Sequence, residues 1–122
     1  MIWKLNEDRP IWVQLKEQLG KQIVTGRYST GERLPSVRDL AREAGVNPNT
    51  MQRALASLDQ DGLTVTSRTS GRCVTTDEAV ISALRRDIAR GIIDNYLEAM
   101  AEMGYSQEEA AAMAGNESPI EN

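Results

Sequence analysis

Side chains able to hydrogen-bond to nucleotide bases stand close together in the middle of the chain: Asn49, Thr50, Gln52 and Arg53. Asn and Gln pair bidentately with adenine in the major groove of DNA, and Arg pairs with guanine. On a helix these four face away from an apolar set with i, i+3, i+4, i+7 spacing: Met51, Ala54, Leu55 and Leu58. Such an acid-free face suits a DNA-reading helix, but an ordinary solvated helix surface has the same composition.

A second helix of the same kind is predicted just before the first. Its apolar positions repeat the spacing: Val37, Leu40, Ala41 and Ala44. Ser36 is placed as its N-cap, with Asp39 where a capping-box acid stands. Gly45 can leave the helix with φ > 0, and Asn47 before Pro48 predicts the N-cap and first residue of the next helix. Residues 34–63 therefore read as a helix-turn-helix.

A supporting helix is predicted upstream, in the stretch PIWVQLKEQLGKQIVTG. It begins at Arg9 or Pro10 and stops before Gly26. Gly20 inside it is small enough to let a neighbouring element approach closely. The first five residues alternate apolar and polar, as an edge strand does, but five residues do not decide between strand and coil.

A β-hairpin is predicted after the helix pair, in LTVTSRTSGRCVTT. Leu63 and Val65 alternate with Thr64 and Thr66, and a Ser-Gly turn follows. The tip, residues 67–72, carries two cations on a loop beside the DNA-reading helix, Arg68 and Arg72. Three helices followed by a hairpin predict a winged helix, whose wing lies next to the groove that the helix occupies.

The rest of the chain reads as two further helices. A capping box of Thr75 and Glu78 starts a long helix from about Asp77 to Met103, and a second box at Ser106 and Glu109 starts a short one that ends by Gly115. The final seven residues, NESPIEN, are expected to be disordered. The fold class is thus mainly α with a small β-hairpin, namely an N-terminal winged helix-turn-helix over 1–76 and a C-terminal helical hairpin over 77–122.

The long helix has an apolar surface wider than one stripe, which is most simply buried against a second copy of the chain. The positions expected in this homodimer contact are Ile81, Leu84, Ile88, Ile92, Tyr96 and Met100. The alternative is that the helix folds back onto the winged helix of its own chain.

Composition narrows the function classes. The chain has 122 residues, no histidine and a single cysteine, Cys73. It therefore lacks the usual ingredients of a zinc site or a His-based catalytic relay, and we expect no metal, no cofactor and no enzymatic activity. It also has no apolar run of membrane-spanning length and no signal peptide, which predicts a cytoplasmic protein without a membrane partner.

The net charge of −4 is distributed unevenly along the chain. Residues 1–76 hold 11 Lys and Arg against 8 Asp and Glu, whereas residues 77–122 hold 3 against 10. The two parts thus carry net charges of +3 and −7. A basic part joined to an acidic part is typical of a DNA-binding module attached to another segment, because only the surface facing phosphate needs to be positive.

Residues 10–75 resemble the DNA-binding domain of the GntR family of bacterial transcriptional regulators. The resemblance rests on PIWVQLKEQL, on TGRYSTGERLPSVRDLAREAGVNPNTMQRALASLDQDGL and on the Arg/Gly-containing wing, in the family's order and spacing. The short helical C-terminal part resembles the YtrA-like subfamily, which dimerises through two helices. This implies a homodimeric repressor that binds an inverted-repeat operator in double-stranded DNA, often of a transporter operon.

The resemblance also implies contact residues. Phosphate and base contacts would fall on Ser36 and Arg38 and, in the recognition helix, on Asn47, Asn49, Thr50, Gln52 and Arg53, with Arg68 and Gly71 added by the wing, to which its charge adds Arg72. The chain departs from the family at Thr69, where glycine is usual, at Cys73, where an aromatic is usual, and at Trp12, where tyrosine is common.

A rival reading is a winged helix that binds proteins rather than DNA. The operator, the regulated genes and any small-molecule effector are not encoded in recognisable form.

Overall fold

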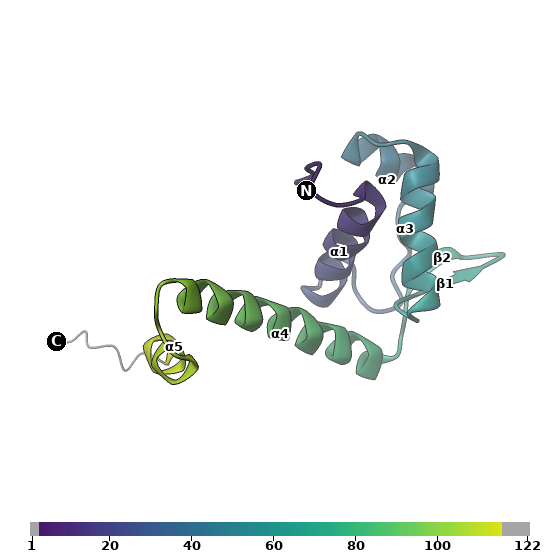
Figure 1. Cartoon of the computed structure of the whole chain (residues 1–122). Helices are drawn as coiled ribbons and strands as arrows, with labels where there is room; N and C mark the ends of the chain where they lie inside the picture. The colour runs from purple at the N-terminus through teal and green to yellow at the C-terminus, as the bar shows by residue number, and fades with distance from the viewer. Residues whose placement is uncertain (1–2, 116–122) are drawn as a thin grey trace. The chain divides into compact units, whose positions relative to one another are not determined.

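The computed structural model of the chain describes residues 3–115, and the predicted disorder of 116–122 lies outside them. Within the described range there are five helices and a two-stranded antiparallel sheet, in the order α1, α2, α3, β1, β2, α4, α5 (Figure 1). The chain divides into two compact units, Met1–Arg85 and Arg86–Asn122, with the boundary inside α4. No helix in this part of the chain is long and apolar enough to cross a membrane.

The first helix, α1 (Ile11–Val24), starts after Pro10, as predicted, and buries one side. Leu15 and Leu19 are fully buried, and Ile23 is nearly so. This burial is the main force that holds the helix, because each such side chain contributes about 1.5–3 kcal/mol when it leaves water.

The segment before α1 is held by buried glutamine rather than by strand pairing. The Gln14 amide donates to the carbonyl oxygens of Asn6 and Arg9, at 2.9 and 2.7 Å, and its oxygen accepts the Asn6 N–H at 3.0 Å. Gln18 bonds the backbone of Lys4 in the same two-way manner. Residues 3–5 therefore form no strand, because their polar backbone groups face a helix.

The helix-turn-helix consists of α2 (Val37–Ala44) and α3 (Pro48–Gln60). The predicted caps are confirmed, since Ser36 accepts the Asp39 N–H at 3.0 Å and Asn47 accepts the Asn49 N–H at 2.7 Å. Gly45 has φ of 72°, the left-handed conformation that ends a helix cleanly. Asp39 does not complete a capping box, because its carboxylate accepts from Arg42 instead. α3 contacts α1, α2 and β1 and is the central element of the unit.

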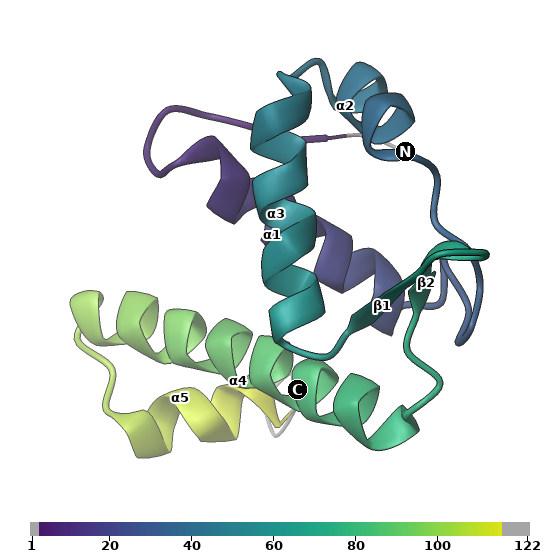
Figure 2. The same ribbon diagram turned by 90° about the vertical axis from the view of Figure 1, so that its right-hand side faces the viewer.

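The wing is the antiparallel pair β1 (Thr64–Ser67) and β2 (Gly71–Val74), as predicted, with Val65 opposite Cys73. Both views place it beside the C-terminal half of α3 (Figures 1 and 2). A third segment lies along the other edge of β2, where the N–H groups of Gly31 and Leu34 donate to carbonyls of that strand at 3.0 and 2.8 Å. The hairpin is thus hydrogen-bonded on both sides of β2.

The apolar–polar alternation predicted for β1 gives the wrong burial for Thr64 and Val65. Thr64 is 2% exposed and Val65 is 56% exposed, the reverse of their polarity. The cause is a hydrogen bond, because the buried Thr64 hydroxyl donates to the carboxylate of Asp59 in α3. A satisfied hydroxyl loses little on burial, so the strand keeps this face inward and leaves valine outside.

The long helix α4 (Glu78–Glu102) begins where predicted but with a different cap. The Asp77 carboxylate accepts the Ala79 N–H at 3.0 Å, while the Thr75 hydroxyl accepts the N–H of Asp77. Thr75 is buried and its own N–H bonds to Leu63, so it belongs to the end of the sheet and not to the helix.

The first two turns of α4 pack inside the first unit. Ile81 is buried, and the Arg85 guanidinium donates to the Val24 carbonyl at 2.9 Å, near the end of α1. Leu84 lies against Gly20, which confirms that the glycine admits a close neighbour. For this part of α4 the alternative of packing on its own chain is correct.

The second unit comprises the remainder of α4 and α5 (Gln107–Ala114). Ser106 and Glu109 form the predicted capping box. The Tyr96 hydroxyl of α4 donates to the Ala110 carbonyl of α5 at 2.8 Å, and Ala110 is buried. These contacts close a helical hairpin, so the predicted fold class is confirmed.

Replacing Gly20 by valine is expected to lower the free energy of unfolding of the first unit by about 1–3 kcal/mol, the usual cost of overpacking. A Cβ atom at position 20 would lie 3.3 Å from Cδ2 of Leu84, and the valine side chain carries two methyl groups beyond that atom. Urea denaturation followed by the fluorescence of Trp3 and Trp12 measures the loss. Gly91→Val is the matched control, since apart from its own stretch of helix backbone nothing in the described chain lies within 4 Å of the added methyl. Equal midpoints for Gly20→Val and wild type would contradict the expectation.

Candidate nucleic-acid interface

The outward face of α3 is assembled as the sequence predicts. Met51, Ala54, Leu55 and Leu58 are at most 1% exposed, which fixes the opposite side of the helix outward. Asn49, Gln52 and Arg53 are exposed, and Thr50 is half-buried. No acidic residue lies among them, so this face can approach a base edge or a phosphate without charge repulsion.

The starts of α2 and α3 carry further predicted contacts. The Ser36 oxygen accepts a backbone N–H, which leaves its hydroxyl hydrogen able to donate to a phosphate. The Asn47 oxygen is likewise used in capping, so its NH₂ group is the part left for DNA. Helix N-termini favour anions, and both caps therefore suit phosphate contacts.

Arg38 is the second residue of α2 and lies exposed in the first turn of that helix. Within residues 3–115 it forms no salt bridge, in contrast to Arg42 on the same helix, which pairs with Asp39 at 3.1 Å. Its guanidinium therefore keeps its full set of donors for a ligand. This fits the base or phosphate contact that the family resemblance implies.

Arg53 is held by an aromatic ring. Its guanidinium carbon lies 4.5 Å from the centroid of the Trp12 ring in α1. A cation over an aromatic face is stabilised by the ring quadrupole, and the stack restricts the rotamers of a long side chain. From the sequence, Trp12 was only a departure from the family's tyrosine, whereas the structure shows that its ring is a platform that presents Arg53.

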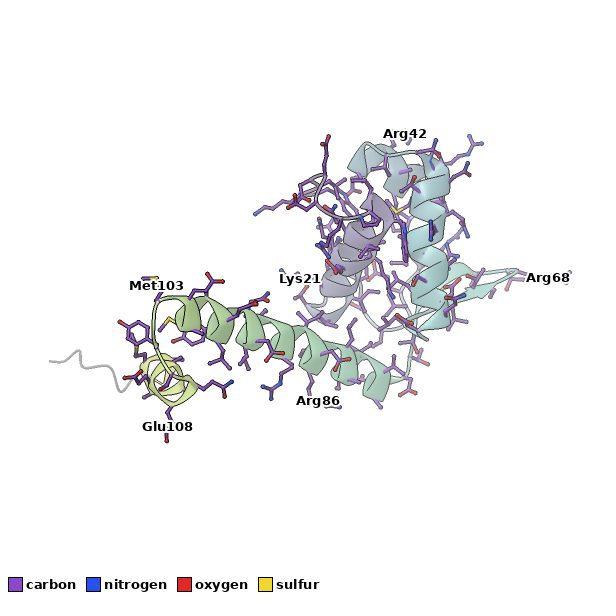
Figure 3. All side chains as sticks on the ribbon, in the orientation of Figure 1. Lys21, Arg42, Arg68, Arg86, Met103 and Glu108 are labelled. Carbon is purple, nitrogen blue, oxygen red and sulfur yellow. The ribbon has the colours of Figure 1, made fainter. Side chains whose placement is uncertain are left out.

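The wing places its two predicted arginines in different environments. Arg68 projects at the tip of the hairpin, exposed, and forms no ion pair with the described residues (Figure 3). Arg72 lies in β2, not on a free loop, and its Nε and Nη2 donate to the two carboxylate oxygens of Asp59 at 3.1 and 2.9 Å. The expectation of two free cations at the tip is therefore wrong for Arg72, because a carboxylate at the end of α3 already neutralises it.

A cation that sequence reasoning missed stands beside the wing. Arg33 is exposed, pairs in an isolated bridge with Cys73, and its side chain crosses Gly71 so closely that a methyl there would lie 3.1 Å from Nε. Gly71 has φ of 72°, so both backbone and space require glycine. Arg33 lies far from the wing in the sequence, so nothing in the sequence indicated that it belongs to the same surface.

The Asp59 carboxyl is tuned by opposing effects. Burial raises its pKa, but the hydrogen bond and charge of Arg72 and the hydroxyls of Thr64 and Thr66 outweigh burial, so the pKa is lowered. A carboxyl with a lowered folded pKa stabilises the fold above its unfolded value of about 3.9, and this contribution disappears as pH falls through the lowered pKa. At neutral pH the Asp59 carboxyl is therefore ionised, and its ion pair with Arg72 is formed.

No group of three His, Cys, Asp or Glu side chains in the described chain is arranged to hold a metal ion. The interface consists instead of amide, hydroxyl and guanidinium groups on α2, α3 and the wing.

The fold and this surface define a winged-helix DNA-binding protein. Residues 12–74 match the family described as bacterial regulatory proteins, gntR family, and the chain belongs to this GntR family. It is 28% identical over 106 residues to the HTH-type transcriptional regulator YhcF of Bacillus subtilis, covering 87% of this chain and 88% of that one. It is therefore a DNA-binding transcriptional regulator and not an enzyme.

Two further similarities support the subfamily and the fold. The chain is 30% identical over 91 residues to the HTH-type transcriptional repressor YtrA of Bacillus subtilis, covering 70% of each. The structure of a GntR family transcriptional regulator from Listeria monocytogenes superposes with a TM-score of 0.81 at 35% identity, over 91% of this chain and 97% of that chain. The YtrA-like resemblance is thus confirmed.

Replacing Trp12 by leucine is expected to weaken operator binding about two- to fivefold, the value of an exposed cation–π contact. Trp12→Tyr keeps an aromatic face and is the matched control, expected within about twofold of wild type on the same reasoning. Fluorescence anisotropy with labelled operator DNA measures both. In an Arg53→Ala background, Trp12→Leu should have no further effect, and a full additional loss there would show that the ring acts through something other than Arg53.

Proposed function

We propose that this regulator is a homodimeric repressor that binds an inverted-repeat operator. The observation that carries the proposal is the exposed, acid-free face of α3, set outward by its buried apolar side. One recognition helix enters one major groove, and a two-fold dimer reads a sequence that is itself two-fold symmetric. Occupying such a site over a promoter excludes polymerase.

The proposed contacts divide into two kinds. Arg38, Asn49, Gln52 and Arg53 have the donors and acceptors to read base edges. The remaining positions suit backbone contacts, because they lie at helix starts or on the wing: Ser36, Asn47, Thr50, Arg68 and Gly71. Arg33 joins this second group by its place beside Gly71.

Repression and operator binding have support from relatives. YtrA and NagR of Bacillus subtilis are both named HTH-type transcriptional repressors. The DNA-binding domain of AraR, which shares this fold with a TM-score of 0.53, has been solved in complex with an operator. The proposal includes a transporter operon as the target, which the family resemblance implies, and a cytoplasmic site of action, where a regulator of transcription in bacteria meets DNA. Selection of bound fragments from genomic DNA identifies the operator.

The proposed partner surface lies on the second unit. Ile92 and Ile93 are 59% and 44% exposed on α4, which is unusual for large aliphatic residues. Ile88 and Met100 are half-buried and adjoin this surface on the helix. Ile81 and Leu84 are used within their own chain, and the Tyr96 hydroxyl bonds to α5, so the dimer contact we propose is centred on Ile92. The proposed division keeps 1–76 for DNA and 77–122 for dimerisation.

Arg38→Ala is expected to cost about 1–3 kcal/mol of binding and to relax preference at particular base pairs, if the guanidinium reads a base. A phosphate contact would instead weaken all sequences alike and flatten the dependence of affinity on salt. Anisotropy titrations on the selected operator and on single-base variants, at several salt concentrations, separate the two. Lys21→Ala is the control, since Lys21 lies on α1 away from the wing tip (Figure 3). Unchanged affinity and selectivity for Arg38→Ala would remove this residue from the interface.

Sedimentation velocity at micromolar concentration is expected to show a dimer for the wild type and a monomer for Ile92→Glu, because an ionised side chain cannot be buried unpaired at a contact. Arg90→Glu introduces the same residue two positions earlier, about 200° around the helix, and should remain dimeric. A wild type that sediments only as a monomer would contradict the dimer.

A further inference from the structure

The ion pair between Arg72 and Asp59 joins the wing to the recognition helix. Its two hydrogen bonds, at 3.1 and 2.9 Å, use both carboxylate oxygens in the bidentate geometry that makes arginine pairs strong and directional. The Arg72 side chain is 13% exposed and that of Asp59 is 29% exposed. The pair is therefore partly withdrawn from water, unlike the surface pair of Arg42 and Asp39 at 77% and 60%.

The same carboxylate also binds the other strand of the wing. The Thr64 hydroxyl donates to Oδ1 of Asp59, and the Thr66 hydroxyl donates to Oδ2 at 3.1 Å. A single side chain in the last turn of α3 thus accepts four hydrogen bonds, two from each strand. Four directional bonds on one carboxylate restrain how the hairpin can pivot relative to the helix.

Using Arg72 as a phosphate contact would dismantle this arrangement. The guanidinium would have to leave Asp59, and a half-buried carboxylate without its cation is strongly unfavourable. The carboxylate would also repel the approaching phosphate. Arg68 and Arg33 face no such obstacle, because neither forms a salt bridge within the described residues.

We infer that Arg72 is a positioning residue, which together with Asp59 locks the wing onto the recognition helix so that Arg68 and Arg33 meet DNA at a fixed distance from α3. Arg72 itself makes no DNA contact. This assignment rests on the proposed DNA-binding surface, but the lock itself is a property of the free protein and can be tested without DNA.

The first test measures backbone amide order parameters of residues 66–71 in the full chain without DNA. The wild type should give values near 0.85, typical of rigid backbone, and Asp59→Asn and Arg72→Gln should each lower them toward or below about 0.6. The double variant should be no more mobile than either single one, because both remove the same contact. A wing that stays rigid in both single variants overturns the lock.

The second test measures operator affinity against salt. Arg72→Gln and Asp59→Asn should each weaken binding by about tenfold, within the range for residues that share one contact, and their effects should not add. The salt slope should stay unchanged for both, whereas Arg68→Gln should reduce it by about 0.9, the loss of one phosphate contact. A slope reduced by Arg72→Gln, with tighter binding by Asp59→Asn, would show that Arg72 contacts phosphate.

A double variant with the two charges exchanged distinguishes loss of the ion pair from simple unfolding. Asp59→Arg combined with Arg72→Asp restores opposite charges across the same contact. A positioning role predicts tighter DNA binding by this double variant than by either of its component single variants. A phosphate role predicts instead that Asp59→Arg, which keeps Arg72 and adds a second cation, binds DNA at least as tightly as the wild type, and that the double variant binds more weakly than Asp59→Arg. If the wild type fails to bind any selected DNA at low salt, the proposed function fails, while the order parameters still decide the lock.

Discussion

The burial of one side of α3 is the constraint on which the other parts of the DNA-binding unit depend. Met51, Ala54, Leu55 and Leu58 are almost completely removed from water, and the helix contacts α1, α2 and β1. Met51, Leu55 and Leu58 contribute about 1.5–3 kcal/mol each when buried, which is large beside any single polar contact. Rotating α3 about its axis would expose them, so its polar face is held outward with no contribution from the polar residues themselves.

Polar contacts then set the finer geometry, and they do so through two different kinds of physics. The ring of Trp12 holds Arg53 by cation–π attraction, which leaves the N–H donors at the guanidinium edge available to a ligand. The carboxylate of Asp59 holds Arg72 by hydrogen bonds, which consume the donors they use. Arg53 can therefore donate to a ligand, whereas Arg72 already donates to Asp59, although both are arginines in the basic part of the chain.

This difference shows what the sequence can predict and what it cannot. Caps, glycine turns and apolar periodicity are local, so Ser36, Gly45 and Asn47 were correctly placed from spacing alone. The partners Arg72 and Asp59 are 13 residues apart, and their meeting depends on how the wing docks on α3. The facing of Thr64 and Val65 depends on the same docking, since a hydrogen bond to Asp59 overrides polarity. At the start of α4 the sequence predicted Thr75 as the cap, but the Thr75 backbone bonds to the end of the sheet, and Asp77 caps the helix instead.

In the dimer we propose, the exposed isoleucines supply only part of the free energy of association. Ile92 and Ile93 are each about half exposed, so burying both in two copies recovers about 3–6 kcal/mol at the usual value per side chain. Association costs about 4–15 kcal/mol in lost freedom, so these four side chains alone do not give a tight dimer. Met103 and Met113, at 76% and 45% exposed, add apolar area. An inverted-repeat operator adds more, because two DNA-bound copies are held at high effective concentration, and dimerisation and operator binding then reinforce each other.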